Sequence, residues 1–348
     1  HYWQLTFRVD GFHLIGEGAK VEEISKDELL KKTKLIFTGF DPSMVYGDGT
    51  APACRNLGEH NLGYQEMLRR NLKGDEGCVS GFTYFQRRNP QTHGVINFFA
   101  DHDGFTMADM VSYERKHNMD NGDDNTDGSN SNYSWNCGAE GKTRRQAVHH
   151  LRMRQLKNAF LMLMTSQGTP MIYGGDEFMN SQKGNNNAWC QDNRIGWVNW
   201  NNGKEGEELL AFVKQLIQFR KSHPVLHGAK ELRLMDYLGA GCPDLSYHSQ
   251  RAWFSQMENT CRFIGVMYCG DYARREDGEP DDYLYVGYNM HWSPHELALP
   301  SLPEKRVWRK TFDTDREESF LGEAAEIVEG KSIRVAPRSI VILVGRQA

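Results

Sequence analysis

The sequence has 348 residues, which is long enough for two domains or for one large barrel with an appended domain. Its hydrophobic content of 39% and charged content of 25% are ordinary for a globular protein with a sizeable core. A formal net charge of −5 gives no long-range attraction to nucleic acid or anionic membranes, and no apolar run is long enough to span a bilayer. We therefore expect neither nucleic acid nor a membrane as a partner.

The cysteines indicate the cellular compartment of the protein, and the first residue indicates whether the sequence includes the N-terminus. The seven cysteines are odd in number, widely spaced and without a C-x-x-C pair, which indicates reduced thiols in a cytoplasmic protein rather than disulfides or a zinc site. We expect no metal and no cofactor. Because the chain begins with His1 rather than Met, we expect the true N-terminus to lie upstream.

The first part of the chain alternates strand and helix patterns. In chain order, strands are predicted over 7–15, 34–40, 95–100 and 168–173, and helices over 21–32, 59–73, 144–166 and 205–222. Repeated strand–helix units are typical of parallel strands joined by helical crossovers. Four or five units are too few to close an eight-stranded barrel and would leave two open sheet edges. We expect the preceding strands upstream; a partner that completes the sheet is the alternative.

The pattern changes near residue 223. Short apolar runs separated by turn-rich segments occupy 262–268, 283–288, 295–299 and 339–343, which is typical of an antiparallel β-sandwich. The predicted fold class is therefore α/β, with an incomplete (β/α)8 TIM barrel over residues 1–222 and an all-β sandwich domain over residues 223–348.

The most informative residues are His102 and Asp103, which stand at the end of the strand-like run 94–100. A strand that delivers an imidazole and a carboxylate to its C-terminal end is typical of a barrel enzyme. An isolated pair of this kind is often a turn with a helix cap, and Thr106 followed by Asp109 does resemble a capping box. The neighbouring sequence decides between these interpretations.

Seven segments in the same order and spacing carry a family resemblance: 97–106, 121–128, 132–138, 154–158, 166–171, 175–178 and 184–193. They resemble the isoamylase and bacterial glycogen-debranching branch of glycoside hydrolase family 13. The resemblance implies an α-glucan substrate with α-1,6 branch linkages. It also implies a (β/α)8 barrel of which this chain contributes about strands 4 to 8.

Two positions depart from the family pattern. Retaining glycoside hydrolysis needs a carboxylate nucleophile and a carboxylic acid about 5 Å apart. The family's D-G-F-R-F-D reads D-G-F-H-L-I over 10–15, so His13 replaces an arginine and Ile15 replaces the nucleophile. The family's K-L-I-A-E-P-W reads K-L-I-F-T-G-F over 34–40, so Thr38 replaces the general acid.

The other implied site residues are retained. His102 resembles the family's donor to a sugar hydroxyl, and Asp103 resembles the carboxylate that stabilises the transition state. Trp135 and Asn187 lie in motifs that combine aromatic rings with amides, which suit the apolar face and the hydroxyls of a sugar. For each of these two motifs the alternative is a loop that satisfies its own hydrogen bonds.

Three functions remain open at this point. One is an active debranching α-1,6-glucosidase that uses the displaced carboxylates Glu17 or Asp41. The second is a pseudoenzyme that binds α-glucan or works as a non-catalytic partner of an active debranching homologue. The third is a decayed or partial product. Because neither Ile nor Thr can supply the missing carboxyl chemistry, the sequence favours the second.

A further motif matches the first half of an EF-hand calcium loop. Asp123, Asn125 and Asp127 have the spacing of the first three ligands, followed by Gly128. The twelfth position is Ser134 rather than a Glu. The loop therefore lacks the bidentate carboxylate on which calcium affinity depends. We expect a polar loop whose side chains bond to its own backbone.

Overall fold

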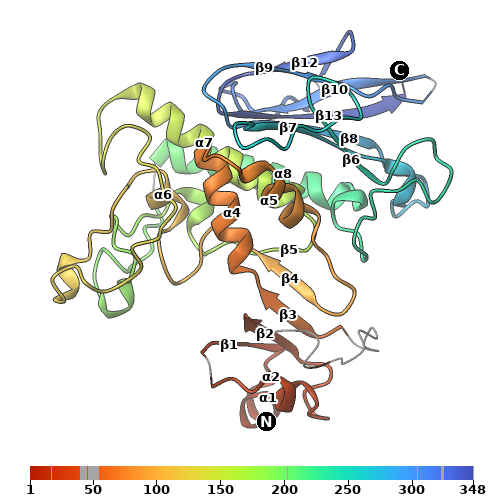
Figure 1. Cartoon of the computed structure of the whole chain (residues 1–348). Helices are drawn as coiled ribbons and strands as arrows, with labels where there is room; N and C mark the ends of the chain where they lie inside the picture. The colour runs from red at the N-terminus through yellow and green to blue at the C-terminus, as the bar shows by residue number, and fades with distance from the viewer. Residues whose placement is uncertain are drawn as a thin grey trace.

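A parallel sheet near the N-terminus and antiparallel sheets near the C-terminus flank a layer of helices (Figure 1). The structure is a computed structural model, and it describes residues 1–16, 18–39, 45, 55–201, 203–303, 305–322 and 325–347. Within these ranges no helix combines the length and apolarity that crossing a membrane requires.

The N-terminal sheet is parallel and its strands are adjacent in chain order. It comprises β1 (Gly11–Leu14), β2 (Lys34–Thr38), β3 (Leu57–His60), β4 (Gly94–Asn97) and β5 (Thr169–Pro170). Leu35 and Phe37 alternate along β2 and are buried with Leu57 of β3 in a small apolar cluster. Register pairs Thr38 with His60, and His60 with Ile96, so the ends of these three strands meet at one edge.

The helices vary greatly in length. They are α1 (Tyr2–Phe7), α2 (Val21–Ser25), α4 (Leu62–Lys73), α5 (Cys78–Arg87), α6 (Met107–Met110), α7 (Gln146–Thr165) and α8 (Gly203–Ser222). Asn61 caps α4, because its side chain accepts the amide hydrogen of Tyr64. Gly74 ends the same helix in the left-handed conformation that favours glycine.

The C-terminal part is antiparallel. Its six-stranded sheet has the order β11 (Glu326–Ile327), β10 (Arg306–Asp313), β13 (Ser339–Gln347), β8 (Tyr283–Asn289), β7 (Phe263–Tyr268) and β6 (Leu245–His248). A two-stranded sheet of β9 (His295–Ala298) and β12 (Ser332–Val335) packs on one face, where Leu297 and Val335 approach Gly287 closely. Helices cover the other face; Phe82 of α5 meets the Tyr288 ring edge-on at 4.8 Å.

The alternation of strands and helices and the antiparallel C-terminal part are confirmed. The helix predicted from residue 59 is wrong at its start, because residues 57–60 form β3 and α4 begins only at Leu62. The helix predicted over 21–32 ends at Ser25, since the Asp27 carboxylate accepts the amides of Leu29 and Leu30 and turns the chain. Phe40, at the end of the strand predicted over 34–40, lies outside the described residues.

The expected domain division stays a prediction. Its boundary coincides with the end of α8 at Ser222, just before Pro224. One apolar core, however, runs from α4, α5, α7 and α8 into the six-stranded sheet without a break at that point.

Candidate functional site

Three imidazoles gather at the C-terminal edge of the parallel sheet. His13 lies on β1, His60 ends β3, and His102 follows β4. The ring centroid of His13 lies 4.7 Å from that of His60 and 6.3 Å from that of His102. The His60 ring also stacks on Phe98 at 4.1 Å. We call His13, His60 and His102, with Thr38, Asp101 and Asp103, the histidine edge.

A hydroxyl, an imidazole and a carboxylate form a chain across three neighbouring strands. Thr38 Oγ1 lies 3.4 Å from Nδ1 of His60. On the opposite side of the ring, Nε2 of His60 lies 3.2 Å from Oδ2 of Asp101, an ion-pair contact whose angle is too poor for a hydrogen bond. Because the His60 side chain is only 4% exposed, these contacts fix its ring. The Thr38 hydroxyl therefore faces an imidazole.

The charge at this edge is set by Asp101 and the imidazoles. Burial alone would raise the pKa of Asp101, but its contact with His60 and the hydrogen bond from the Asp103 amide lower it below the ordinary value. Asp101 is thus ionised at neutral pH. Partial burial, then the nearby His60 and His102, lower the pKa of His13, with Asp101 opposing them. His13 is therefore mostly neutral at pH 7.

The turn that carries His102 and Asp103 is exposed but firmly held. The Asp103 amide donates to Oδ1 of Asp101 at 3.0 Å, and the Gly104 amide donates to the Asn186 carbonyl at 3.0 Å. Gly104 has a φ of +102°, which favours glycine at this point of the turn. Both His102 and Asp103 therefore reach solvent from a fixed backbone.

Arg69 of α4 holds this turn in place through hydrogen bonds to backbone carbonyls. It is buried, and its guanidinium donates to the carbonyls of Phe99, Asn132 and Phe105 at 2.7, 3.0 and 3.0 Å. Phe99 and Phe105 lie on either side of the His102–Asp103 turn. Burial lowers the pKa of Arg69 to about 10, so the side chain is still charged at neutral pH.

Ile15 follows β1 directly and is 61% exposed. It carries no group that could attack a sugar or exchange a proton. Glu17 and Asp41, the carboxylates considered as replacements, both lie outside the described residues. Five residues were singled out by sequence around the expected reaction centre. His13, Thr38, His102 and Asp103 belong to the histidine edge, and Ile15 lies one residue beyond β1.

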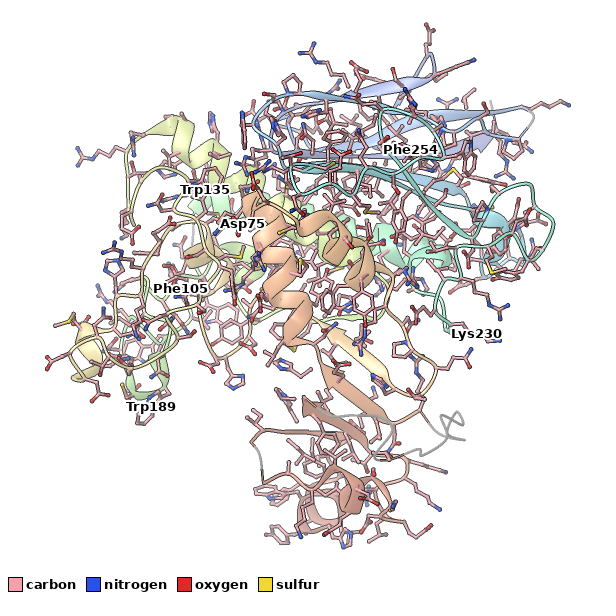
Figure 2. The ribbon with its side chains drawn as sticks, in the orientation of Figure 1. Asp75, Phe105, Trp135, Trp189, Lys230 and Phe254 are labelled. Carbon is pink, nitrogen blue, oxygen red and sulfur yellow. The ribbon has the colours of Figure 1, made fainter. Side chains whose placement is uncertain are left out.

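Trp135 and Asn187 lie in other surroundings. The Arg338 guanidinium covers the Trp135 ring at 4.9 Å, and the Trp135 amide donates to the Met110 carbonyl. Trp135 is far from Trp189, the tryptophan of the Asn187 motif (Figure 2). Asn187 donates from Nδ2 to Oδ2 of Asp127 at 2.8 Å. Their contact with sugar stays a prediction, and both side chains already have partners within the protein.

The calcium-like loop is filled by a cation of the protein itself. Lys116, only 8% exposed, donates from Nζ to the carbonyls of Thr126, Asp127 and Gly128 at 3.3, 2.7 and 3.0 Å. Asn121 and Asn187 both donate to Asp127 and lower its pKa. Asn125 and Asp127 thus accept hydrogen bonds from residues outside the loop, whereas the sequence predicted bonding to the loop's own backbone.

The imidazoles of the histidine edge do not converge as metal ligands. In the described ranges, the single group of ligand atoms close enough to share an ion is His223, Asp281 and Asp282. Asp282 already accepts a hydrogen bond from Arg346 at 2.8 Å, and Asp281 accepts the Val225 amide at 2.9 Å. These contacts fit an internal ion pair at the end of α8 better than a metal centre.

Sequence reasoning missed His60 and Asp101. The strand that ends at His60 was hidden because its residues were assigned to the following helix. Asp101 directly precedes the conspicuous His102–Asp103 pair, and its position at the end of β4 was the available signal.

Curated relatives match most of this chain. Chloroplastic isoamylase 1 of rice is 34% identical over 304 residues, which cover 85% of this chain and 36% of the relative. Chloroplastic isoamylase 3 of rice is 31% identical, with 98% of this chain and 44% of the relative covered. A glycogen operon protein GlgX homolog of Mycobacterium tuberculosis is 30% identical, with 90% and 48% covered. The chain thus spans between about a third and a half of these relatives. No family model matches it.

Solved structures share the fold at lower identity. Type I pullulanase from Bacillus subtilis, solved with maltose, superimposes with a TM-score of 0.65 at 16% identity, over 99% of this chain and 44% of the pullulanase. Pullulanase from Anoxybacillus sp. LM18-11, solved with maltotetraose, gives a TM-score of 0.62 at 16% identity, over 99% and 45%.

Proposed function

Since this chain is homologous to the isoamylases and glycogen-debranching enzymes of glycoside hydrolase family 13, we propose that it binds α-glucan and has lost glycosidic hydrolysis. The observation that carries the proposal is that one edge of the parallel sheet keeps two of the family's site residues and has lost its two catalytic carboxyl groups. His102 and Asp103 are exposed and braced, whereas Ile15 and Thr38 stand where the family resemblance expects the nucleophile and the acid.

Loss of hydrolysis follows from the chemistry of the two substituted side chains. The Ile15 side chain has no lone pair, so it cannot form a covalent glycosyl intermediate. A threonine hydroxyl is too weakly acidic to protonate a leaving oxygen, and that of Thr38 lies 3.4 Å from His60. Asp103 alone supplies neither role, because a stabilising carboxylate needs a nucleophile or an activated water to act with.

Binding can persist without hydrolysis. His102 can donate to a sugar hydroxyl, and the Asp103 carboxylate can accept from one. Burial lowers the pKa of His13, so the imidazole at the position of the family's arginine is mostly neutral near pH 7. The non-catalytic role, alone or beside an active debranching homologue, is thus favoured over a displaced catalytic pair at Glu17 or Asp41.

The fold proposal follows the same homology. We assign β1 to β5 to strands 4 to 8 of a (β/α)8 barrel within residues 1–222, with residues 223–348 as the sandwich domain. The outer edge of β1, which pairs only with β2 among the described strands, would then receive strand 3. A cytoplasmic location with reduced thiols is part of the proposal; the described cysteines are free, and several relatives are named chloroplastic.

The binding experiment uses the full-length protein and a branched maltooligosaccharide in a calorimetric titration. We expect saturable binding that the double variant H102A/D103A weakens by roughly tenfold or more, because two hydrogen bonds of about 1 kcal/mol each are lost. The control is E276A, which removes an exposed carboxylate in the C-terminal part. Absence of binding by the wild-type protein would refute the proposal and leave a decayed product as the remaining interpretation.

A further inference from the structure

The histidine edge contains the three kinds of group that nucleophilic acyl transfer uses. The Thr38 hydroxyl, the His60 imidazole and the Asp101 carboxylate follow one another at contact distances of 3.4 and 3.2 Å. In hydrolases of this kind the hydroxyl attacks a carbonyl carbon, the imidazole takes its proton, and the carboxylate orients the ring. This chemistry differs from retaining glycoside hydrolysis, which uses two carboxyl groups.

The register of the parallel sheet sets these three groups side by side. Thr38 ends β2 and pairs with His60 at the end of β3, and Asp101 lies shortly after β4. Each of these strands has a described strand on both sides, so the contacts are made within the described sheet. The side chains of His60 and Asp101 are nearly buried, whereas Thr38 is half-buried. The hydroxyl is therefore the member of the chain that a substrate can reach.

The surroundings of His60 suit it to act as a base. Its Nδ1 faces Oγ1 of Thr38, and its Nε2 faces Oδ2 of Asp101. Because Asp101 is ionised, it favours the tautomer that carries the proton on Nε2, which leaves the lone pair of Nδ1 directed at the hydroxyl. Once Nδ1 has taken the hydroxyl proton, the same carboxylate stabilises the imidazolium that results.

His13 can donate a hydrogen bond to the oxyanion that forms when a carbonyl is attacked. It lies on β1, on the other side of β2 from His60, and the two ring centroids are 4.7 Å apart. His13 is mostly neutral near pH 7, and a neutral imidazole keeps one N–H donor. A fixed donor aimed at the position where negative charge develops lowers the barrier of acyl transfer.

We propose that the histidine edge hydrolyses short-chain carboxylic esters, with Thr38 as the nucleophile, His60 as the general base and Asp101 as the residue that positions His60. Thr38 Oγ1 bonds to the ester carbonyl carbon, its proton passes to Nδ1 of His60, and the carbonyl oxygen becomes an oxyanion. When the oxyanion collapses, the bond to the alcohol oxygen breaks and His60 returns the proton to the departing alcohol. Water then attacks the acyl-threonine with His60 again as the base, which releases the carboxylic acid and restores Thr38.

An acyl group on a sugar hydroxyl is the form of ester that suits this edge. The ring centroid of His102 lies 6.3 Å from that of His13, and Asp103 is its neighbour in the chain. A sugar whose hydroxyls contact His102 and Asp103 would carry an ester substituent at the same sheet edge as Thr38. The sugar part of the substrate rests on the proposed function, whereas the hydrolysis of a simple ester does not.

A second chain of hydroxyl, imidazole and carboxylate provides a matched control. Thr92 Oγ1 lies 2.9 Å from Nδ1 of His93, whose Nε2 lies 3.2 Å from Oε2 of Glu59. Thr92 precedes β4, at the N-terminal edge of the sheet, and Glu59 is also paired with Arg88. In barrels of parallel strands the reactive groups lie at the C-terminal edge. We therefore expect this second chain to be inactive.

The test follows the hydrolysis of para-nitrophenyl acetate by the purified full-length protein. T38V keeps the shape of the side chain but removes the hydroxyl, and we expect it to lose about a hundredfold or more of the wild-type rate. T38S should retain activity, and T92V should match the wild type. D101N should lower kcat roughly tenfold or more with little change in KM, because Asp101 positions the base and does not contact the ester.

Mass spectrometry of the acid-quenched reaction locates the acyl group. We expect one acetyl group on the peptide that contains Thr38, and none on that peptide in T38V. The circular dichroism spectrum and the Tm of T38V should match those of the wild type, so that loss of activity is not loss of fold.

The outcomes separate ester chemistry from glucan binding. Equal rates for T38V and the wild type, acetylation only of other side chains, or a loss of activity in T92V would each overturn the proposal, whether or not the protein binds glucan. If Thr38 is acylated but calorimetry detects no binding of branched maltooligosaccharide, the esterase proposal stands and the proposed function is refuted. If the simple ester is hydrolysed through Thr38 but an acetylated maltooligosaccharide is not, the activity is supported and the sugar ester is refuted as its substrate.

Discussion

Oδ2 of Asp101 lies 3.2 Å from Nε2 of His60, and this contact joins the ends of β3 and β4. Both side chains are nearly inaccessible to solvent. The carboxylate also receives the Asp103 amide, so one buried group orients both the imidazole that faces Thr38 and the turn that presents Asp103.

Replacing Asp101 with Asn should destabilise the protein by about 2 kcal/mol, because the buried carboxylate that contacts His60 and accepts the Asp103 amide becomes a neutral amide. Urea unfolding monitored by tryptophan fluorescence measures the change. The matched control is D103N at the exposed neighbour, which should cost less than about 0.5 kcal/mol. Equal stability of the two variants would show that the Asp101–His60 contact contributes nothing.

Acid should destabilise the C-terminal sheet through His248. Burial lowers the pKa of His248 to about 4, and its Nδ1 accepts the Trp253 amide at 2.8 Å, so the folded state requires the neutral ring. The unfolded ring titrates near 6.5. The unfolded state thus binds the proton more readily, and stability is complete above pH 6.5 and falls as pH drops toward 4.

The expected size of this loss is about 3 kcal/mol between pH 8 and pH 4. Other groups titrate over the same range, so the decisive quantity is the difference in pH dependence between the wild type and H248Q. The free energy of unfolding of H248Q should fall by about 3 kcal/mol less over that interval. Parallel pH profiles for the two proteins would contradict the assignment.

Lys116 should hold the 123–128 loop without calcium. In K116M three carbonyls near the ammonium lose their donor, which should cost about 2 kcal/mol. Amide hydrogen exchange around residues 118–128 should become faster, whereas K142M, an exposed control, should leave it unchanged. The Tm of the wild type should respond neither to calcium nor to a chelator. Stabilisation by calcium would contradict this account.

Arg69 should be required for the geometry of the His102–Asp103 turn. A lysine at position 69 has a single ammonium in place of the planar guanidinium that reaches three carbonyls. R69K should therefore lose about 2 kcal/mol of stability and bind branched maltooligosaccharide more weakly. The adjacent half-exposed Arg70 gives the control R70K, which should preserve both properties. Unchanged binding by R69K would show that Arg69 does not position the turn.

The sequence predicted the fold where apolar periodicity was strong and failed where it was weak. The long helix predicted over 144–166 matches α7, because its buried face extends over many turns. The residues of β3 escaped detection, since a four-residue strand buried between two neighbours has no alternation to reveal it. Hydrogen bonds from Asp27 end α2 early, and such local competition is hard to see in a charged sequence.

The candidate site was only partly predictable. His102 and Asp103 were found because they follow a clear strand and match a family pattern. His60 was out of reach, because its role depends on the register between β2 and β3, which sets Thr38 opposite it.

The central claim, that hydrolysis is lost at Ile15 and Thr38, is tested most directly by the release of reducing ends from glycogen by full-length purified protein. We expect no release above that of a denatured sample, and no difference between the wild type and D103A. Sustained release by the wild type that D103A abolishes would contradict the claim.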